Sequence, residues 1–168
     1  MFFKMFPRML YEIEGEYLNY PDIFRRVGTN DVFKKFVYLD TYHIDDGERI
    51  EEVANAIYGN PSYHWVILIT NDIVDPIHEW PLSTTDLIKY CQKKYGTNGL
   101  YTVHHYEFND ASGITVDYDA TKLSAGTIKS VSNFEYEVKL NEAKRSIKLL
   151  KKQYLTEFVN QFKRSVRK

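Results

Sequence analysis

The sequence predicts an α+β protein built around a small β-α-α-β module. In residues 37–76, a strand-like alternation of apolar and polar residues precedes two short segments with helical spacing. Residues 101–108 and 127–140 alternate again, as strands do, and an apolar stripe through residues 141–166 predicts a long C-terminal helix. Hydrophobic residues form 43% and charged residues 27% of the 168-residue chain, a composition typical of a folded domain rather than a disordered one.

Residues 1–36 form the predicted N-terminal arm. They lack a clear period but are rich in Phe and Tyr, so we expect an irregular segment that docks on its own domain or on another subunit. Tyr20-Pro21-Asp22 is typical of a turn, and Asp22 can cap a short helix over residues 23–27.

The module is predicted over residues 37–76. A strand comes first, and a helix follows whose acidic first turn and apolar stripe end at Gly59, a left-handed stop. Ser62 can cap a second helix over residues 63–70, with Trp65 in the core of the module. The stripe of the first helix is formed by Ile50, Val53, Ala54 and Ile57.

Residues 77–140 are predicted to hold a further helix and a β-rich segment. The helix begins at Ser83 or Thr84 and runs to Lys94, and a strand follows over residues 101–108. Residues 109–126 are polar and rich in turn formers, which favours a hairpin connection or an exposed loop. Residues 127–140 return as one or two strands.

Residues 141–168 are predicted to form one basic amphipathic helix capped by Asn141. Nine Lys and Arg against two Glu give this segment a net charge of +7, so the other 140 residues carry −8. Such a division favours head-to-tail contacts or an acidic partner. The apolar side of the helix, which needs a covering surface, is formed by Ile147, Leu150, Tyr154, Phe158, Phe162 and Val166.

Several classes of protein are disfavoured by composition. No apolar run is long enough for a membrane span, and residues 1–10 lack the pattern of a signal peptide. The single Cys91 excludes an internal disulfide and fits a reducing compartment; Lys93 and Lys94 would lower its pKa slightly. The histidines lack metal-ligand spacing, so neither a metal nor a cofactor is expected; they are His43, His64, His78, His104 and His105.

The sequence resembles known families at two levels, in the module alone and over the whole chain. The module resembles LysM through Tyr42-x-Ile44, Gly47-Glu48, Ile50-x-x-Val53-Ala54, Tyr58-Gly59 and Asn71. The whole chain resembles the LysM-containing baseplate wedge subunit of contractile-tailed, T4-like bacteriophages. That likeness rests on Asp22-Ile23-Phe24-Arg25, on residues 54–61, on Trp65-Val66, Asn71-Asp72, Asp75-Pro76 and Trp80, and on Asn141-Glu142-x-Lys144-Arg145-x-Ile147-Lys148.

The wedge resemblance implies a structural virion protein without enzymatic activity, located in the tail baseplate and assembled in the host cytoplasm. In that family the subunit clamps the central wedge bundle and joins neighbouring wedges into a ring around the tail hub. Its expected partners are therefore other wedge proteins and the neighbouring wedge, with no nucleic acid and no membrane. Residues 96–126 are fewer than the family pattern leads us to expect.

The loops of the module favour a protein ligand over a sugar. LysM modules hold N-acetylglucosamine polymers between two loops, which in this chain carry five carboxylates: Asp45, Asp46, Glu48, Asp72 and Asp75. A neutral sugar gains nothing from that charge, whereas a basic protein surface does. Tyr63 and His64 are predicted interface residues on the second helix, and Ile147, Tyr154, Phe158 and Phe162 are predicted to anchor the C-terminal helix within a wedge.

Two alternatives remain open from the sequence. One is a LysM-type protein that binds peptidoglycan in lysis or at the cell wall. The other is a hydrolase using carboxylates such as Asp72, Asp75 and Glu79, although these positions are more typical of turns and caps. The basic C-terminal segment does not favour nucleic acid, because its aromatic residues share the apolar stripe instead of alternating with the lysines.

Overall fold

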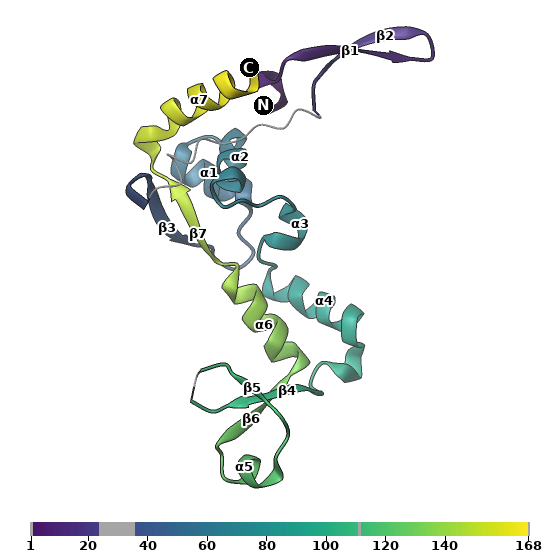
Figure 1. Ribbon diagram of the computed structural model, residues 1–168, viewed down its shortest axis with the longest axis vertical. Coiled ribbons are helices and arrows are strands. Elements are labelled where there is room, and N and C mark those ends of the chain that lie inside the picture. The colour runs from purple at the N-terminus through teal and green to yellow at the C-terminus, as the bar shows by residue number, and fades with distance from the viewer. Residues whose placement is uncertain (1, 24–35, 111, 168) are drawn as a thin grey trace. The chain divides into compact units, whose positions relative to one another are not determined.

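The computed structural model describes residues 2–23, 36–110 and 112–167, which form two compact units (Figure 1). The first unit contains the described residues up to Ile44, then Glu48–Glu79 and the residues from Ser146 onward. The second contains Asp45–Gly47 and Trp80–Arg145. Helices and small antiparallel sheets make up the chain, so the predicted α+β class is confirmed.

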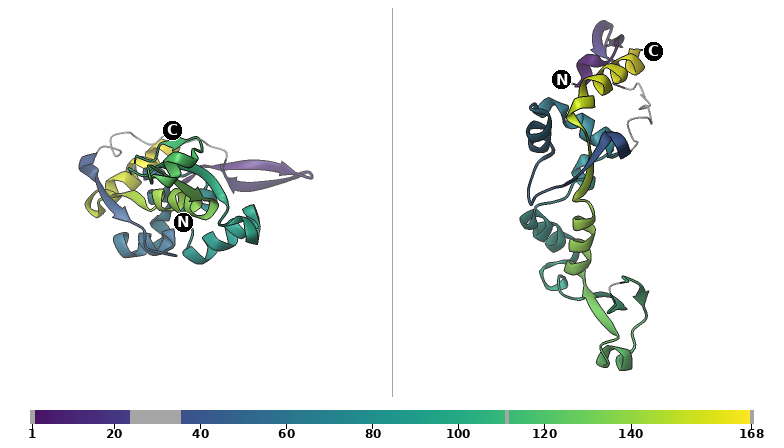
Figure 2. Two further views of the ribbon diagram at one scale, coloured as in Figure 1. Left: turned by 90° about the horizontal axis from the view of Figure 1, so that it is seen from below. Right: turned by 90° about the vertical axis from the view of Figure 1, so that its left-hand side faces the viewer.

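A β-α-α-β module lies within the first unit. Its strands β3 and β7 pair antiparallel, with Leu39 opposite Leu150 and His43 opposite Ser146. Figure 2 shows these two strands side by side, although most of the second unit separates them in the sequence. The elements of this part are η3 (Phe36–Tyr38), β3 (Leu39–His43), α1 (Ile50–Tyr58), η4 (Pro61–Tyr63), α2 (His64–Thr70), α3 (Pro76–Glu79) and β7 (Ser146–Leu150).

The closing strand corrects two predictions at once. We expected the module to close within residues 37–76 and residues 141–166 to be helical, but Ser146–Leu150 is a strand. Ile147 and Leu149 are buried and Lys148 between them is exposed, the two-residue alternation of a strand. Because Ile147 and Leu150 also stand three residues apart, the same apolar residues fit a helical stripe.

The two helices of the module begin and end largely as predicted. Gly59 follows α1 with a φ of 78°, a left-handed conformation that glycine adopts without strain. The Glu52 side chain accepts a hydrogen bond from the Arg49 N–H (2.8 Å) and stabilises the first turn of α1. Ser62 is not the predicted cap: the Asn60 side chain accepts from the Ser62 N–H (2.8 Å), and α2 begins at His64.

The core of the module is formed by both helices and by the strand β7. Ile44, Val53 and Ile67 are fully buried, together with Ala54 and Val66. The Tyr58 hydroxyl donates a hydrogen bond to the Leu150 carbonyl (3.0 Å), and burial raises the pKa of this phenol above its ordinary value. Tyr58 therefore ties α1 to the closing strand.

The predicted C-terminal helix exists, but it is shorter than expected. After η6 (Lys152–Tyr154), α7 runs over Leu155–Arg167. The Trp65 ring stacks on Phe158 (5.9 Å between ring centres) and lies 4.9 Å from Phe162, so the predicted core role of Trp65 is confirmed. The buried residues of α7 keep the predicted spacing and are Leu155, Phe158, Phe162 and Val166.

The N-terminal segment is not the irregular arm that we expected. After η1 (Phe2–Met5), strands β1 (Arg8–Ile13) and β2 (Glu16–Pro21) form a hairpin paired from Arg8–Pro21 to Ile13–Glu16. Glu14 and Gly15 form its turn, both with positive φ (54° and 84°). The helix predicted over residues 23–27 lies outside the described residues, apart from Ile23.

The second unit packs two helices around a small core. Leu87 and Cys91 on α4 meet Leu100, and Phe134 and Val138 pack against them from α6. Burial raises the pKa of the Cys91 thiol and outweighs the lowering effect of Lys94, so the predicted net lowering of this pKa is wrong. The elements are α4 (Thr84–Tyr95), η5 (Thr97–Gly99), β4 (Val103–Phe108), β5 (Thr115–Val116), α5 (Ala120–Ser124), β6 (Ile128–Ser132) and α6 (Asn133–Ala143), with the sheet order β5-β4-β6.

Residues 133–140 were predicted as strand but belong to helix α6. Ser132 and Glu135 form a capping box: the Ser132 hydroxyl accepts from the Glu135 N–H (3.2 Å), and the Glu135 carboxylate accepts from the Ser132 N–H (2.7 Å). Phe134 and Val138 stand four residues apart on the buried face of the helix. The strand prediction failed because aromatic and charged residues alternate in this segment, and such an alternation is typical of a strand even though the segment is helical.

Buried polar groups complete this unit. The side-chain amide of Asn141 accepts from the Leu82 N–H (2.8 Å) and donates to the Leu82 carbonyl (3.0 Å), so this residue ties α6 to another segment and is not the predicted N-cap. Burial opposes ionisation of Glu137, but hydrogen bonds from Lys94 and Tyr95 (both 2.7 Å) leave its pKa below the ordinary value.

Candidate protein-interaction surfaces

The five carboxylates predicted to form one acidic rim belong to two units. Asp45 and Asp46 lie in the second unit, whereas Glu48, Asp72 and Asp75 lie in the first. A single continuous rim therefore stays a prediction, and each carboxylate has its own surroundings within its unit.

Asp46 has a structural role in the second unit. Its carboxylate accepts hydrogen bonds from the Arg145 guanidinium (2.7 Å) and from the N–H of Thr84 (3.0 Å), at the first turn of α4. Arg145 is buried and also bonds Glu142 (2.7 Å). The bond from Arg145 lowers the pKa of Asp46. A substitution of Asp46 would therefore leave the buried positive charge of Arg145 with fewer carboxylate partners.

The acidic residues of the first unit differ in exposure and bonding. Glu48 is half-buried, and its two carboxylate oxygens lie 2.9 and 3.1 Å from the donating hydroxyl of Tyr42. Asp72 is exposed and has a φ of 55°, so it turns the chain after α2. Asp75 accepts from the Ile77 N–H (3.0 Å) and contacts His78 (2.6 Å), and the bond with His78 lowers its pKa.

The four residues predicted to anchor the C-terminal segment within a wedge are largely buried in their own unit. Ile147 lies on β7 opposite Tyr42 and is 6% exposed, and Phe158 and Phe162 are 5% and 6% exposed. Tyr154 is half-buried, with its ring edge against Tyr38 (4.8 Å). Ile147, Phe158 and Phe162 are therefore buried within their own unit, and their contact with a partner stays a prediction.

Tyr63 and His64, the predicted interface residues, border two grooves of the first unit. An apolar groove of about 550 Å³ crosses α2 beside η1. Its lining includes Phe3, His64, Trp65, Leu68, Ile69 and Ile73. Since Phe3 is about half exposed, this hydrophobic surface is open to a partner.

A basic groove of about 480 Å³ adjoins the apolar one, because both are lined by Ser62 and Trp65. The exposed cations Lys4, Lys163 and Arg167 stand along it. Lys163 and Arg167 are one turn apart on α7. Over the described ranges, no ion pair joins any of these three cations to a carboxylate.

The sequence of α2 contains a signal for the apolar groove. The residues of α2, HWVILIT, are apolar on every side, whereas a helix on the surface of a single domain has one apolar stripe. Trp65, Val66 and Ile67 fill the core, so Leu68 and Ile69 are left for a second surface. The basic groove has a weaker signal, the pair of cations four residues apart on α7.

Among residues 2–23, 36–110 and 112–167, no three His, Cys, Asp or Glu side chains are grouped so that they can hold a metal. None of the described helices is both long enough and apolar enough to span a membrane.

Comparison with known proteins connects these surfaces to an assembly. A family model described as "Base plate wedge protein 53" matches residues 1–115, about two thirds of the chain. The chain belongs to this family. The wedge protein is also similar to baseplate wedge protein gp53 of Enterobacteria phage T4, at 33% identity over 166 residues that cover 88% of this chain and 84% of the relative.

Family membership confirms the prediction of a structural wedge subunit located in the baseplate of the virion. The LysM-like character of the module stays a prediction, although its β-α-α-β order is the one that the resemblance implies. Which residues contact which partner also stays a prediction.

Proposed function

We propose that this wedge protein joins neighbouring baseplate wedges into a ring and clamps the wedge core, without catalysing a reaction. The family match is the observation that supports this function most strongly, since gp53 of T4 is itself named a baseplate wedge protein. The structure adds several separate surfaces suited to proteins: the apolar groove, the basic groove and the exposed acidic residues.

The connectivity of the chain suits a clamp. Most of the second unit, Trp80–Arg145, is inserted between α3 and β7, so the module closes only when the strand after the insertion pairs with β3. Five residue pairs make this contact, from Leu39–Leu150 to His43–Ser146. A force that pulls on both units is therefore resisted by strand pairing as well as by the covalent chain.

The candidate catalytic groups have structural surroundings, which supports a role without catalysis. Glu79 accepts from the backbone N–H groups of Val74 (3.1 Å) and Asp75 (3.4 Å), and Asp75 caps the short helix α3. The Cys91 thiol is fully buried with a raised pKa, the opposite of what a nucleophile needs.

The acidic residues are proposed to face a basic surface on the neighbouring wedge. The test replaces Asp45 by Lys and Asp72 by Asn and leaves Asp46 unchanged, because Asp46 bonds the buried Arg145. Asn tolerates the positive φ at position 72. The matched control is Asp117→Lys, a charge reversal at an exposed carboxylate of the second unit.

Ring formation from purified wedges is then followed by electron microscopy. We expect single wedges to form normally with Asp45→Lys/Asp72→Asn and closed rings to become rare, while Asp117→Lys closes rings as the unaltered chain does. Normal ring closure by the double variant would remove these carboxylates from the contact between wedges. Salt-resistant retention of the chain on purified peptidoglycan would favour the sugar-binding alternative instead.

A further inference from the structure

The hairpin β1–β2 carries an apolar face that the described chain covers only in part, since Tyr11 and Leu18 are half-buried and the other apolar residues are exposed. Residues that pair directly across the strands point to the same side, which sorts the twelve strand residues into two faces. One face holds Met9, Tyr11, Ile13, Leu18 and Tyr20, with Glu16 at its end. Met9, Ile13 and Tyr20 are about half exposed.

A two-stranded hairpin is only marginally stable by itself, so an apolar face of this extent indicates a partner. The opposite face is mixed: Leu10 and Tyr17 are each 68% exposed there, but the polar residues Arg8, Glu12 and Asn19 separate them, so this face has no continuous apolar surface. The partner is therefore expected to cover the face of Met9, Ile13 and Tyr20, which we call the hairpin apolar face together with Tyr11 and Leu18.

The tip of the hairpin is acidic and contains a strained residue. Glu14 has a φ of 54° in a two-residue turn whose first position favours Asn or Gly. A glutamate in this conformation costs free energy, and strain of this kind persists mainly at functional sites. With Glu16 beside it, the tip presents two exposed carboxylates at the end of the hairpin apolar face.

In the two grooves of the first unit, an apolar surface likewise lies next to charged residues, but these charges are positive. The apolar groove, with Phe3, Leu68 and Ile69, adjoins the basic groove, with Lys163 and Arg167. An apolar face that ends in carboxylates thus matches an apolar groove that ends in cations. The complementary surfaces belong to one and the same chain.

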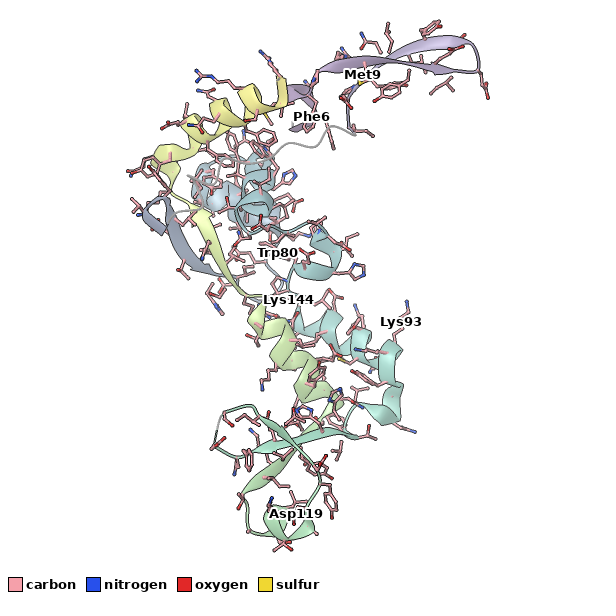
Figure 3. The ribbon with its side chains drawn as sticks, viewed as in Figure 1. Phe6, Met9, Trp80, Lys93, Asp119 and Lys144 are labelled. Carbon is pink, nitrogen blue, oxygen red and sulfur yellow. The ribbon has the colours of Figure 1, made fainter. Side chains whose placement is uncertain are left out.

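A copy of the chain cannot satisfy both surfaces by folding its own hairpin back. Phe3 and Lys4 line the grooves, and Phe6 packs against Phe162 (6.4 Å between ring centres), so the root of the hairpin lies at the grooves. Figure 3 labels Phe6 at this root and Met9 at the start of the hairpin. β1 has six residues, which at ~3.3 Å per residue places the tip about 20 Å away.

We propose that the hairpin of one copy docks by its apolar face and acidic tip into the apolar and basic grooves of a second copy of this chain. Such a contact joins two different surfaces, so it propagates from copy to copy and closes when the rotation between copies completes a ring. Its part in ring closure rests on the proposed function; the contact between copies does not.

One face of a short hairpin buries less area than a stable interface needs, so association of the free chain is weak. The test therefore uses sedimentation equilibrium of the full chain up to about 1 mM, the effective concentration typical of linked partners in an assembly. Two variants reverse the charges: Glu14→Lys/Glu16→Lys at the tip, and Lys163→Glu/Arg167→Glu in the basic groove. Their matched controls are Glu12→Lys on the other hairpin face and Arg164→Glu elsewhere on α7.

We expect each reversal to raise the dissociation constant about tenfold or more. The controls should leave it unchanged, and the chain that carries both reversals should associate again because the charges are exchanged. Circular dichroism shows whether each variant folds. Absence of association by the unaltered chain, or failure of the exchanged chain to recover it, overturns the proposal.

A cross-link provides a second measurement that does not depend on charge. Since the native Cys91 is buried, the variant Ile13→Cys/Leu68→Cys offers one reactive thiol on the hairpin and one in the apolar groove. Disulfides between copies, in a ladder of multimers, support the contact. A disulfide within one copy overturns it, since the hairpin would then reach its own groove. A negative result in the sedimentation or the cross-linking experiment does not bear on the role of Asp45 and Asp72 in ring closure. The proposed function is therefore tested separately.

Discussion

Asn71 offers the sharpest test of how the module closes. Its side-chain amide donates to the carbonyl groups of Lys148 (2.7 Å) and Ile67 (2.9 Å), and its oxygen accepts from the Lys148 N–H (2.8 Å). The side chain therefore pairs with β7 as a neighbouring strand residue would. Asn71→Ala removes all three hydrogen bonds at once.

The expected loss follows from these bonds. Each intramolecular hydrogen bond contributes about 1 kcal/mol net, and Asn71 is half-buried, so water replaces part of what is lost. We expect Asn71→Ala to lower the free energy of unfolding by about 2 kcal/mol, and the melting temperature by about 6 °C in a chain of this length. Urea unfolding followed by circular dichroism measures the first quantity.

A second substitution at the same position tests the geometry. Asn71→Asp keeps the acceptor for the Lys148 N–H but places a carboxylate beside two carbonyl oxygens, which raises the pKa of the new carboxyl in the folded state. The variant should be least stable near neutral pH and recover as pH falls through the raised pKa, with recovery complete by about pH 4, because the protonated acid regains a donor.

The control is Asn160→Ala, at an exposed position of α7, which should change stability by less than about 0.5 kcal/mol. If Asn71→Ala unfolds no more easily than this control, Asn71 does not hold the closing strand and the reasoning is refuted.

Three further predictions concern the cores of the two units. Phe162→Ala should destabilise the protein by about 3–5 kcal/mol in urea unfolding, because Phe162 is buried between Trp65 and Phe6; a loss below 1 kcal/mol would contradict its core position. Since Arg145 holds the pKa of Asp46 below its ordinary value, this contact stabilises the fold at neutral pH and is lost as pH falls through the lowered pKa. Unfolding measured from neutral to acidic pH should therefore change less in Asp46→Asn, and equal slopes would contradict the ion pair. Cys91 should react slowly with a thiol reagent in the folded protein and rapidly in urea, because it is buried with a raised pKa; rapid labelling of the folded chain would show that α4 does not cover it.

Local signals in the sequence predicted the elements whose residues contact their neighbours along the chain. Gly59 ended α1 as expected, and α4 begins and ends within a residue of its predicted bounds, because caps and stops act within one turn. The class of the fold and the core position of Trp65 followed from the same patterns.

The elements that failed depend on partners far away in the sequence. Ser146–Leu150 is a strand because β3, about a hundred residues earlier, offers an edge; its spacing alone fits either period. Helix α6 shows little apolar stripe, because Glu137 and Asn141 occupy its buried side with partners on other segments. A pattern of apolar residues cannot anticipate such polar contacts.

The candidate site was predictable only in part. The exposed acidic residues follow from charge, but the sequence cannot tell that Asp46 is committed to Arg145 or that Phe158 and Phe162 are covered by their own chain. The grooves arise where η1, α2 and α7 meet, so they require the tertiary structure.

Whether the wedge protein joins neighbouring wedges can be measured by ring closure. Wedges purified without this chain are mixed with increasing amounts of it, and closed rings are counted by electron microscopy. We expect wedges to stay separate until the chain is added, and the number of closed rings to rise in proportion to the chain bound. Rings that close equally well without the chain would show that it does not join the wedges.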